Sequence, residues 1–279
     1  MDLRRLLRLI NVLLFLTSSL CLSGVVWFCL RICTPAQQRK TWAALTQGWA
    51  RSLLWLLGVR VTRYGSTALA ANQPVLLVAN HQSYLDILIC AAHFPARFVA
   101  KHELRQWPGL GALAALGGTL FLDRASTHSA VRCVYRASQA LRQGASVAVF
   151  PEGTTTDGQA LPQFKPLFFA AALRAQTPVQ PLTIALQSIN GSPVEAASHP
   201  LFYWIADDDF LRHFWRLLAV RQLEVALITH PLLFPAKRGR SQEFARQAEL
   251  AVQAGLSLTP LSAGSLAIQP EFYLDLSQV

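Results

Sequence analysis

A histidine and an acid lie five residues apart, directly after a strand-like run. His81 and Asp86 belong to the segment 80–86, which follows the apolar run 74–79. Imidazole has the proton affinity to accept a hydroxyl proton near neutral pH, and a carboxylate can hold its tautomer. The two side chains can meet if His81 lies on a turn and Asp86 in the first turn of a following helix. The spacing therefore predicts a general base at a strand-to-helix junction, with Ser83 as a candidate N-cap of the helix; a turn whose His81 and Asp86 merely cap that helix is the alternative.

Two further groups of polar residues and glycines follow later strand-like runs. The segment 118–124 reads GTLFLDR, and the segment 150–156 reads FPEGTTT. Short apolar runs alternate with helical stretches from residue 58 onward, which favours a largely parallel sheet covered by helices. In such sheets, sites gather at the carboxyl ends of the strands. The expected strands are 59–62, 75–78, 98–100, 119–122, 147–150, 179–185 and 223–228, and the expected helices are 85–92, 128–142, 166–175 and 242–253.

The blocks N-H-x4-D, G-x-x-F-x-x-R and F-P-E-G-T, followed by a strand that carries Pro181, occur in this order. This pattern resembles that of the glycerophospholipid acyltransferases, in particular bacterial 1-acylglycerol-3-phosphate O-acyltransferases and their lyso-ornithine-lipid relatives. The likeness runs from about Val59 to Pro235. It implies a glycerol-3-phosphate acyltransferase-like α/β fold with N-terminal membrane helices.

The resemblance also implies roles for residues of the second and third blocks. Gly118, Phe121 and Arg124 would hold the glycerol phosphate of the acceptor, while the third block would position the substrate. The residues of that block concerned are Glu152, Gly153 and Thr154. Arginine suits phosphate because its guanidinium presents a fixed fork of donors. A surface ion pair with Asp123 is the alternative for Arg124.

Two lysines lie beside expected strand ends. Lys101 follows the third strand and Lys165 follows the third block. Each is a candidate contact for a phosphate or for the oxyanion of a tetrahedral intermediate, with a solvated surface lysine as the alternative.

The third block departs from the common pattern of the family at one position. The common form carries arginine after the threonine, whereas this chain has Thr155 and continues Thr156-Asp157-Gly158. Part of the phosphate clamp is therefore in doubt, and a zwitterionic or amino-acid-based acceptor such as lyso-ornithine lipid gains weight.

The chain offers no evident nucleophile of its own. Gly144-Ala145-Ser146-Val147-Ala148 lacks the second glycine of a G-x-S-x-G elbow, and no cysteine pairs convincingly with His81. Direct attack of the acceptor hydroxyl on an acyl thioester is expected instead, with acyl-CoA or acyl-carrier protein as donor substrate and neither metal nor cofactor. A serine hydrolase is the alternative that a missing nucleophile disfavours.

The composition points to a membrane. Hydrophobic residues make up 52% and charged residues 14% of the chain, against about 25% charged in typical soluble domains. The net charge of +10 favours anionic lipid over nucleic acid, because the basic residues are scattered through apolar sequence and no nucleic-acid module appears. The five cysteines show neither metal spacing nor a disulfide framework, which indicates a reducing compartment.

Three regions are expected: membrane-attachment helices at 1–57, a catalytic domain at 58–260 and a tail at 261–279. Leu9 to Leu30 carries no charge and is long enough to cross a bilayer core of about 30 Å; a signal peptide is the alternative. Trp42 to Leu57 suits an interfacial helix or the second arm of a shallow hairpin. The aromatic segment 201–220 is expected to form an amphipathic surface helix or lid beside the lipid.

The sequence thus predicts an enzyme of the bacterial inner membrane with its catalytic domain on the cytoplasmic side. It would acylate 1-acyl-sn-glycerol-3-phosphate to phosphatidic acid in phospholipid biosynthesis. The alternatives are lyso-ornithine lipid acylation and, from a different class, a non-catalytic lipid-binding membrane protein. The intact pair of His81 and Asp86 argues against a pure binder, which has no need of a base.

Overall fold

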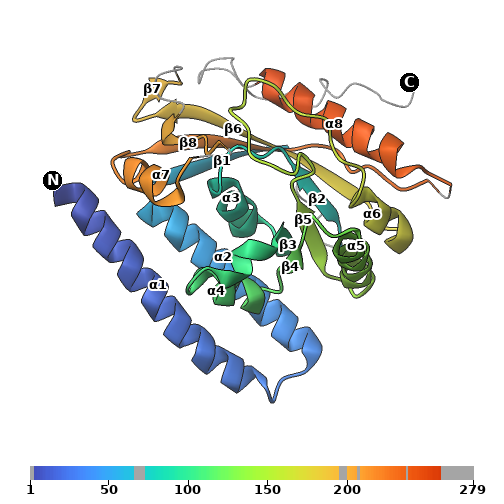
Figure 1. The fold of residues 1–279 in the computed structure, drawn as a ribbon, viewed down its shortest axis with the longest axis horizontal. Coiled ribbons are helices and arrows are strands. Elements are labelled where there is room, and N and C mark those ends of the chain that lie inside the picture. The colour runs from blue at the N-terminus through green and yellow to red at the C-terminus, as the bar shows by residue number, and fades with distance from the viewer. Residues whose placement is uncertain (1–2, 66–72, 195–199, 206–207, 237, 259–279) are drawn as a thin grey trace.

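The computed structural model describes residues 3–65, 73–194, 200–205, 208–236 and 238–258 (Figure 1). The predicted tail at 261–279 lies outside these residues. The helices are α1 (Leu3–Leu30), α2 (Pro35–Leu56), α3 (Leu85–His93), the 3₁₀ helix η1 (His102–Gln106), α4 (Leu110–Leu116), α5 (Thr127–Arg142), α6 (Phe169–Ala175), α7 (Phe210–Leu217) and α8 (Ser241–Leu258). The strands are β1 (Val59–Gly65), β2 (Leu76–Ala79), β3 (Ala96–Lys101), β4 (Leu120–Leu122), β5 (Ser146–Val149), β6 (Val179–Ile189), β7 (Ser192–Pro193) and β8 (Leu223–Thr229).

The strands form one mixed, mostly parallel sheet in the order β1-β8-β6-β2-β5-β3-β4, with β7 paired to β6. The five strands from β6 to β4 run parallel to one another, whereas β8 runs antiparallel to β6. The predicted α/β class and parallel sheet are confirmed. Because β2, β5, β3 and β4 share one direction, their carboxyl ends meet at a single edge of the sheet, where the first three sequence blocks begin or end.

Helices cover both faces of this sheet and give it two apolar cores. One core joins the sheet to α2, α3 and α7, and includes Leu53, Ile89 and Leu217. The other joins it to α5, α6 and α8, and includes Leu141, Phe169 and Phe244. The sheet is therefore buried on both sides, which is the usual state of a parallel sheet and explains the near-continuous apolar runs of its strands.

The first two helices form a hairpin along one side of the molecule (Figure 1). α1 is apolar and long enough to cross a membrane, and only 6% of its most apolar 18-residue stretch is buried. Its exposed side chains include Leu14 and Phe28. In contrast to these exposed side chains of α1, Ala50 and Leu54 of α2 are buried in the apolar core on one face of the sheet. The second helix therefore packs against the sheet layer in addition to following α1.

One arginine of α1 joins that helix to the segment between α7 and β8. The guanidinium of Arg8 donates hydrogen bonds to the carbonyl oxygens of Leu218 and Val220 after α7, and of Arg221 at 3.2 Å. These carbonyls follow the end of a helix, where a cation is favoured. Arg8 thus holds the start of α1 against the turn that precedes β8.

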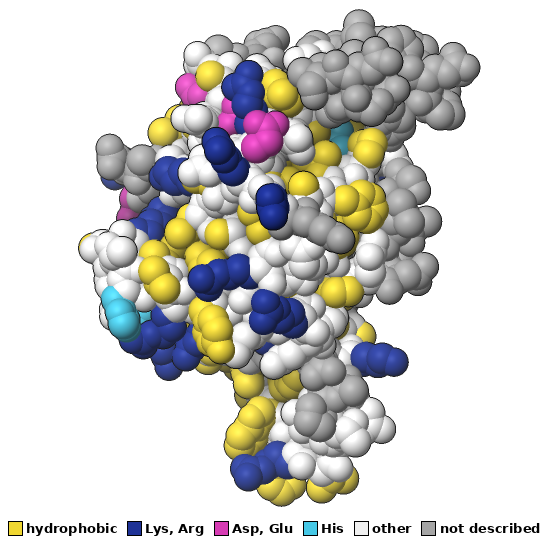
Figure 2. All heavy atoms as spheres, turned by 90° about the vertical axis from the view of Figure 1, so that its right-hand side faces the viewer, with side chains coloured by type: hydrophobic (Ala, Val, Ile, Leu, Met, Phe, Trp, Pro, Cys, Tyr) yellow, Lys and Arg dark blue, Asp and Glu magenta, His cyan; other side chains and the backbone are white. Residues whose placement is uncertain are grey.

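Basic side chains are spread widely over the surface. Figure 2 shows the side on which α5 and α6 lie, with many lysine and arginine side chains and few acidic ones. This distribution agrees with the net charge of +10.

Replacing Arg8 with glutamine is expected to loosen α1 from the α/β part of the fold. The loss of charged hydrogen bonds should cost about 2 kcal/mol, which lowers the Tm by about 4 to 8 °C for a chain of this size. Thermal unfolding in detergent measures this. Arg31→Gln, directly after the exposed far end of α1, should leave the Tm unchanged. An equal decrease of the Tm in both variants would contradict this role of Arg8.

Candidate active site

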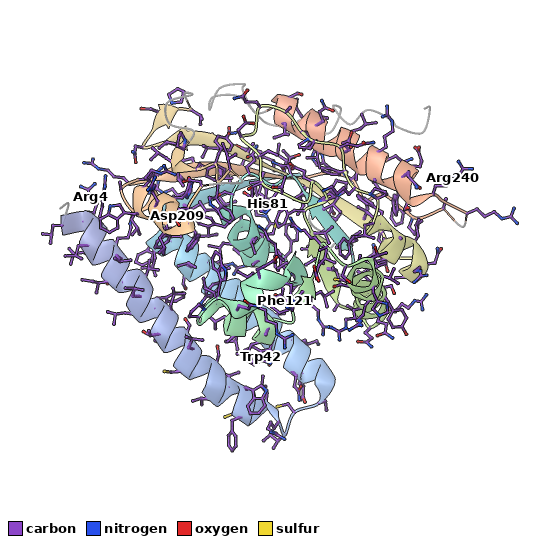
Figure 3. The ribbon with its side chains drawn as sticks, in the orientation of Figure 1. Arg4, Trp42, His81, Phe121, Asp209 and Arg240 are labelled. Carbon is purple, nitrogen blue, oxygen red and sulfur yellow. The ribbon has the colours of Figure 1, made fainter. Side chains whose placement is uncertain are left out.

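His81 and Asp86 meet at the junction between β2 and α3. His81 Nδ1 lies 2.9 Å from Asp86 Oδ2, so the predicted contact is confirmed. Because a carboxylate only accepts hydrogen bonds, Nδ1 carries the proton and Nε2 is left as the basic nitrogen. Figure 3 places His81 near the middle of the fold, at the edge where the parallel strands end. The geometry is that of a general base with an orienting acid.

The Asp86 carboxylate also holds the loop on which His81 lies. Asp86 is fully buried, and its Oδ2 accepts the backbone N–H groups of Gln82 at 2.6 Å and Ser83 at 2.7 Å. The expectation that Ser83 is the N-cap is wrong, because α3 begins at Leu85 with Tyr84 as its cap residue. Instead, the acid in the first helical turn binds the N–H groups that precede the helix.

Two neighbours fix the position of the histidine from other strands. The His81 ring stacks on Phe150, which follows β5, with centroids 4.1 Å apart. The side chain of Asn80 pairs with the backbone of Ile184 on β6, accepting its N–H at 2.8 Å and donating to its carbonyl at 2.8 Å. The segment 80–86, the catalytic loop, is thus held to both strands that flank β2.

Glu152 lies against the backbone of the same loop. Its Oε1 accepts the His81 N–H at 2.6 Å, and only 3% of the residue is exposed. Burial raises the pKa of the Glu152 carboxyl to about 8, and the charge of Asp86 adds to the rise, while the hydrogen bonds from His81 and Thr156 oppose it. Glu152 therefore positions the loop that carries His81. The position of Glu152 in the third block did not indicate this contact with the His81 backbone.

The rest of the third block wraps over the His81 turn. The Thr156 N–H donates to the His81 carbonyl at 3.0 Å. Gly153 has a φ of +78°, and a Cβ added there would lie 2.6 Å from Lys165 Nζ. Glycine is needed at this position because the backbone is left-handed and the lysine ammonium lies against it. Lys165 is thereby placed beside the block, and its predicted contact with phosphate or oxyanion stays a prediction, while Thr154 is exposed on the same turn.

The other predicted basic residues lie further along the same edge. Lys101 ends β3 and pairs in register with Leu122, the last residue of β4, two positions before Arg124. Both basic side chains are exposed. Asp123 and Arg124 form no ion pair within the described residues; the Asp123 carboxylate accepts the Ala125 N–H instead.

The two remaining residues of the second block occupy different places. Phe121 lies within β4, and the guanidinium of Arg105 sits 5.9 Å from its ring centroid. Gly118 precedes β4 at its amino end, with a φ of +78° and the side chain of Arg97 in contact. The left-handed backbone and the close contact with Arg97 explain why this position is a glycine. A substrate-binding role for either residue stays a prediction.

The aromatic segment forms a helix beside the catalytic loop. α7 lies over Tyr84, whose hydroxyl is 3.0 Å from Nδ1 of His213. His213 is fully buried, so the expected surface helix also carries a residue that contacts the loop. Spacing within the sequence does not reveal this pair, because 129 positions separate the two residues.

The raised pKa of Glu152 predicts a pH dependence of stability. A carboxyl with a pKa of about 8 when folded and about 4.3 when unfolded binds its proton more tightly in the native state. Its contribution is therefore fully present below about pH 4.3 and is lost as the pH rises to 8, by up to about 1.4 kcal/mol per pH unit. Glu152→Gln keeps the acceptor for the His81 N–H and should flatten this slope in denaturant unfolding between pH 5 and 8. Equal slopes in both proteins would show that Glu152 is already ionised.

Comparisons with known proteins agree with this geometry. Residues 60–185 match the family model described as Acyltransferase. The lyso-ornithine lipid O-acyltransferase of Pseudomonas aeruginosa is 38% identical over 224 residues, covering 80% of each chain. The 1-acyl-sn-glycerol-3-phosphate acyltransferase of Neisseria gonorrhoeae is 30% identical over 54% of this chain and 57% of that protein.

The fold is also that of a solved structure. The crystal structure of the 1-acyl-sn-glycerophosphate acyltransferase PlsC from Thermotoga maritima superimposes with a TM-score of 0.65 at 22% identity, over 92% of this chain and all of that one. The resemblance in sequence blocks, the contact of His81 with Asp86 and these matches lead to one conclusion. The chain is an enzyme of the acyltransferase family that includes lyso-ornithine lipid and 1-acyl-sn-glycerol-3-phosphate acyltransferases.

Proposed function

We propose that the protein transfers a fatty acyl group from a thioester donor to the hydroxyl of lyso-ornithine lipid. His81 Nε2 takes the hydroxyl proton, and the oxygen attacks the thioester carbonyl to form a tetrahedral intermediate. The intermediate collapses with loss of the thiolate, which receives the proton from His81. The ester and the free thiol are the products, and Asp86 stabilises the imidazolium between the two proton transfers.

The loop after Glu152 carries the acceptor assignment. Thr155 occupies the position at which the family pattern has arginine, and the acid Asp157 follows two residues later. That loop lies at the catalytic turn, because Thr156 binds the His81 carbonyl and a Cβ on Gly158 would meet Gln82. Asp157 is near enough to help raise the pKa of the buried Tyr203, after the effect of burial itself and of Asp86. A neutral threonine in place of a phosphate-binding arginine, with an acid two residues later, favours an acceptor with an ammonium group.

Acylation of 1-acyl-sn-glycerol-3-phosphate is the second candidate. Lys101, Arg124 and Lys165 are basic residues at the same sheet edge, and they can bind either a phosphate or the carboxylate of an amino-acid head group. The acceptor is thus decided by the residues nearer the histidine.

The donor and the location complete the proposal. Acyl-CoA or acyl-carrier protein supplies the thioester, and residues of the protein do the proton transfer without a cofactor. We place the enzyme on the cytoplasmic face of a bacterial inner membrane. The exposed apolar α1 supports membrane attachment, and the described cysteines, which are all free, support a reducing compartment.

The role of His81 is tested by His81→Ala in membranes supplied with labelled acyl-CoA or acyl-carrier protein. Loss of a general base should lower kcat by two to four orders of magnitude. His93→Gln, at the far end of α3, is the matched control and should keep full activity. Product formation from lyso-ornithine lipid and from lysophosphatidic acid is followed by mass spectrometry. Inactivity of the native protein on both acceptors would refute the proposed reaction.

The acceptor assignment predicts the effect of Thr155→Arg. The added guanidinium should raise the rate on lysophosphatidic acid relative to lyso-ornithine lipid by about tenfold, since one charged hydrogen bond contributes about 1.5 to 3 kcal/mol. Gln143→Arg adds the same charge on the surface after α5 and should leave the ratio unchanged. An unchanged ratio in Thr155→Arg would show that this position does not select the acceptor.

A further inference from the structure

Tyr84 lies inside the catalytic loop, between His81 and Asp86. Its hydroxyl leaves the loop and meets Nδ1 of His213 on α7 at 3.0 Å. Its ring also packs edge-on against Phe210 and Trp204, with centroids 5.2 Å and 5.8 Å away. The loop is therefore held from three directions: by Asp86 from within, by Glu152 from β5 and by α7 from outside.

α7 is itself fixed at its start. Asp209 caps it by accepting the Arg212 N–H at 2.8 Å, and Asp208 forms an ion pair with Arg216. Trp204 joins this end to the catalytic loop, because its backbone N–H donates to the Gln82 carbonyl at 2.9 Å. Asp209 marks this end of the helix in Figure 3.

The end of α7 is fixed by α1. The carbonyls of Leu218 and Val220, directly after the helix, accept hydrogen bonds from Arg8. α7 is thus held at both ends and links the first helix to the catalytic loop. A side chain on such a helix can hold another residue within the small tolerance that a general base requires.

Burial favours the uncharged form of both partners. It raises the pKa of Tyr84, and the nearby Asp208 raises it further, while Arg216 lowers it. Burial also lowers the pKa of His213, although Asp208 and a hydrogen bond to the Tyr203 backbone oppose this shift. One hydrogen bond thus joins the Tyr84 hydroxyl to the His213 ring, and its direction follows the tautomer of His213.

We propose that Tyr84 and His213 are positioning residues, which hold the catalytic loop so that His81 Nε2 points at the acceptor hydroxyl. The inference rests on the proposed function of His81 as base. Neither residue needs to touch a substrate; the pair acts through the loop backbone. A single hydrogen bond of this kind fixes the loop at the point midway between the base and its acid.

The test is a double-mutant cycle on kcat. Tyr84→Phe keeps the ring and removes the hydroxyl, and His213→Leu removes its hydrogen-bond partner. Each single change should lower kcat about tenfold with KM for donor and acceptor within twofold, and the double variant should be no slower than either. His213→Asn, which presents an oxygen near the place of Nδ1, should recover most of the loss. Non-additivity of this kind is expected only of groups that act as one unit.

A matched control and a second readout complete the design. Tyr135→Phe removes a tyrosine hydroxyl that bonds Gln139 on the exposed face of α5, and it should leave kcat unchanged. The downfield Nδ1 proton of His81, assigned by its loss in His81→Ala, should shift or broaden in Tyr84→Phe and not in Tyr135→Phe. This NMR signal does not depend on the acceptor, so it tests the pair even if the proposed reaction fails.

Three results would overturn the proposal. They are additive losses in the double variant, an effect confined to KM, and an unchanged His81 signal in Tyr84→Phe. The first two would assign the residues to substrate binding or to general stability, and the third would show that the loop keeps its geometry without the hydroxyl.

Discussion

A single buried carboxylate organises the catalytic loop. Asp86 Oδ2 accepts hydrogen bonds from the His81 ring and from the N–H groups of Gln82 and Ser83. A buried charge without such donors would be strongly unfavourable, so the loop must close around the carboxylate for the native state to form. The hydrogen bonds that stabilise the Asp86 carboxylate therefore also set the tautomer and the orientation of the His81 imidazole. Structure and chemistry depend on the same three hydrogen bonds.

The parallel sheet supplies the setting for this loop. β2, β5, β3 and β4 end at one edge, which gathers residues from separate blocks without any covalent constraint. The contact between Glu152 and the His81 N–H shows how close that gathering is. A helix layer on each face makes the strands rigid, so the loops at their ends start from fixed positions. The site is thus built from short loops that a rigid scaffold positions, which is where catalytic residues are commonly found.

Attachment to the membrane and catalysis share elements of the fold. α1 is largely exposed and apolar, yet its Arg8 binds the carbonyls that follow α7, and α7 contacts Tyr84 of the catalytic loop. A continuous set of contacts from the membrane-facing helix to the loop provides a physical reason for the two functions to lie in one compact domain.

The sequence by itself determined the class of fold, the contact of His81 with Asp86, and the order of the blocks. Each of these is local: alternating apolar runs, a five-residue spacing and short blocks at strand ends leave a signal in neighbouring residues. The strands 59–62 to 223–228 were all found, whereas the N-cap at Ser83 was wrong because α3 begins only at Leu85, with Tyr84 as its cap residue. Only the tertiary structure decided the contact of Glu152 with the His81 backbone, the placement of Lys165 over Gly153, and the bond between Tyr84 and His213. These contacts join residues that are 12 to 129 positions apart, and such pairings are chosen by the packing of whole elements and not by any pattern along the chain.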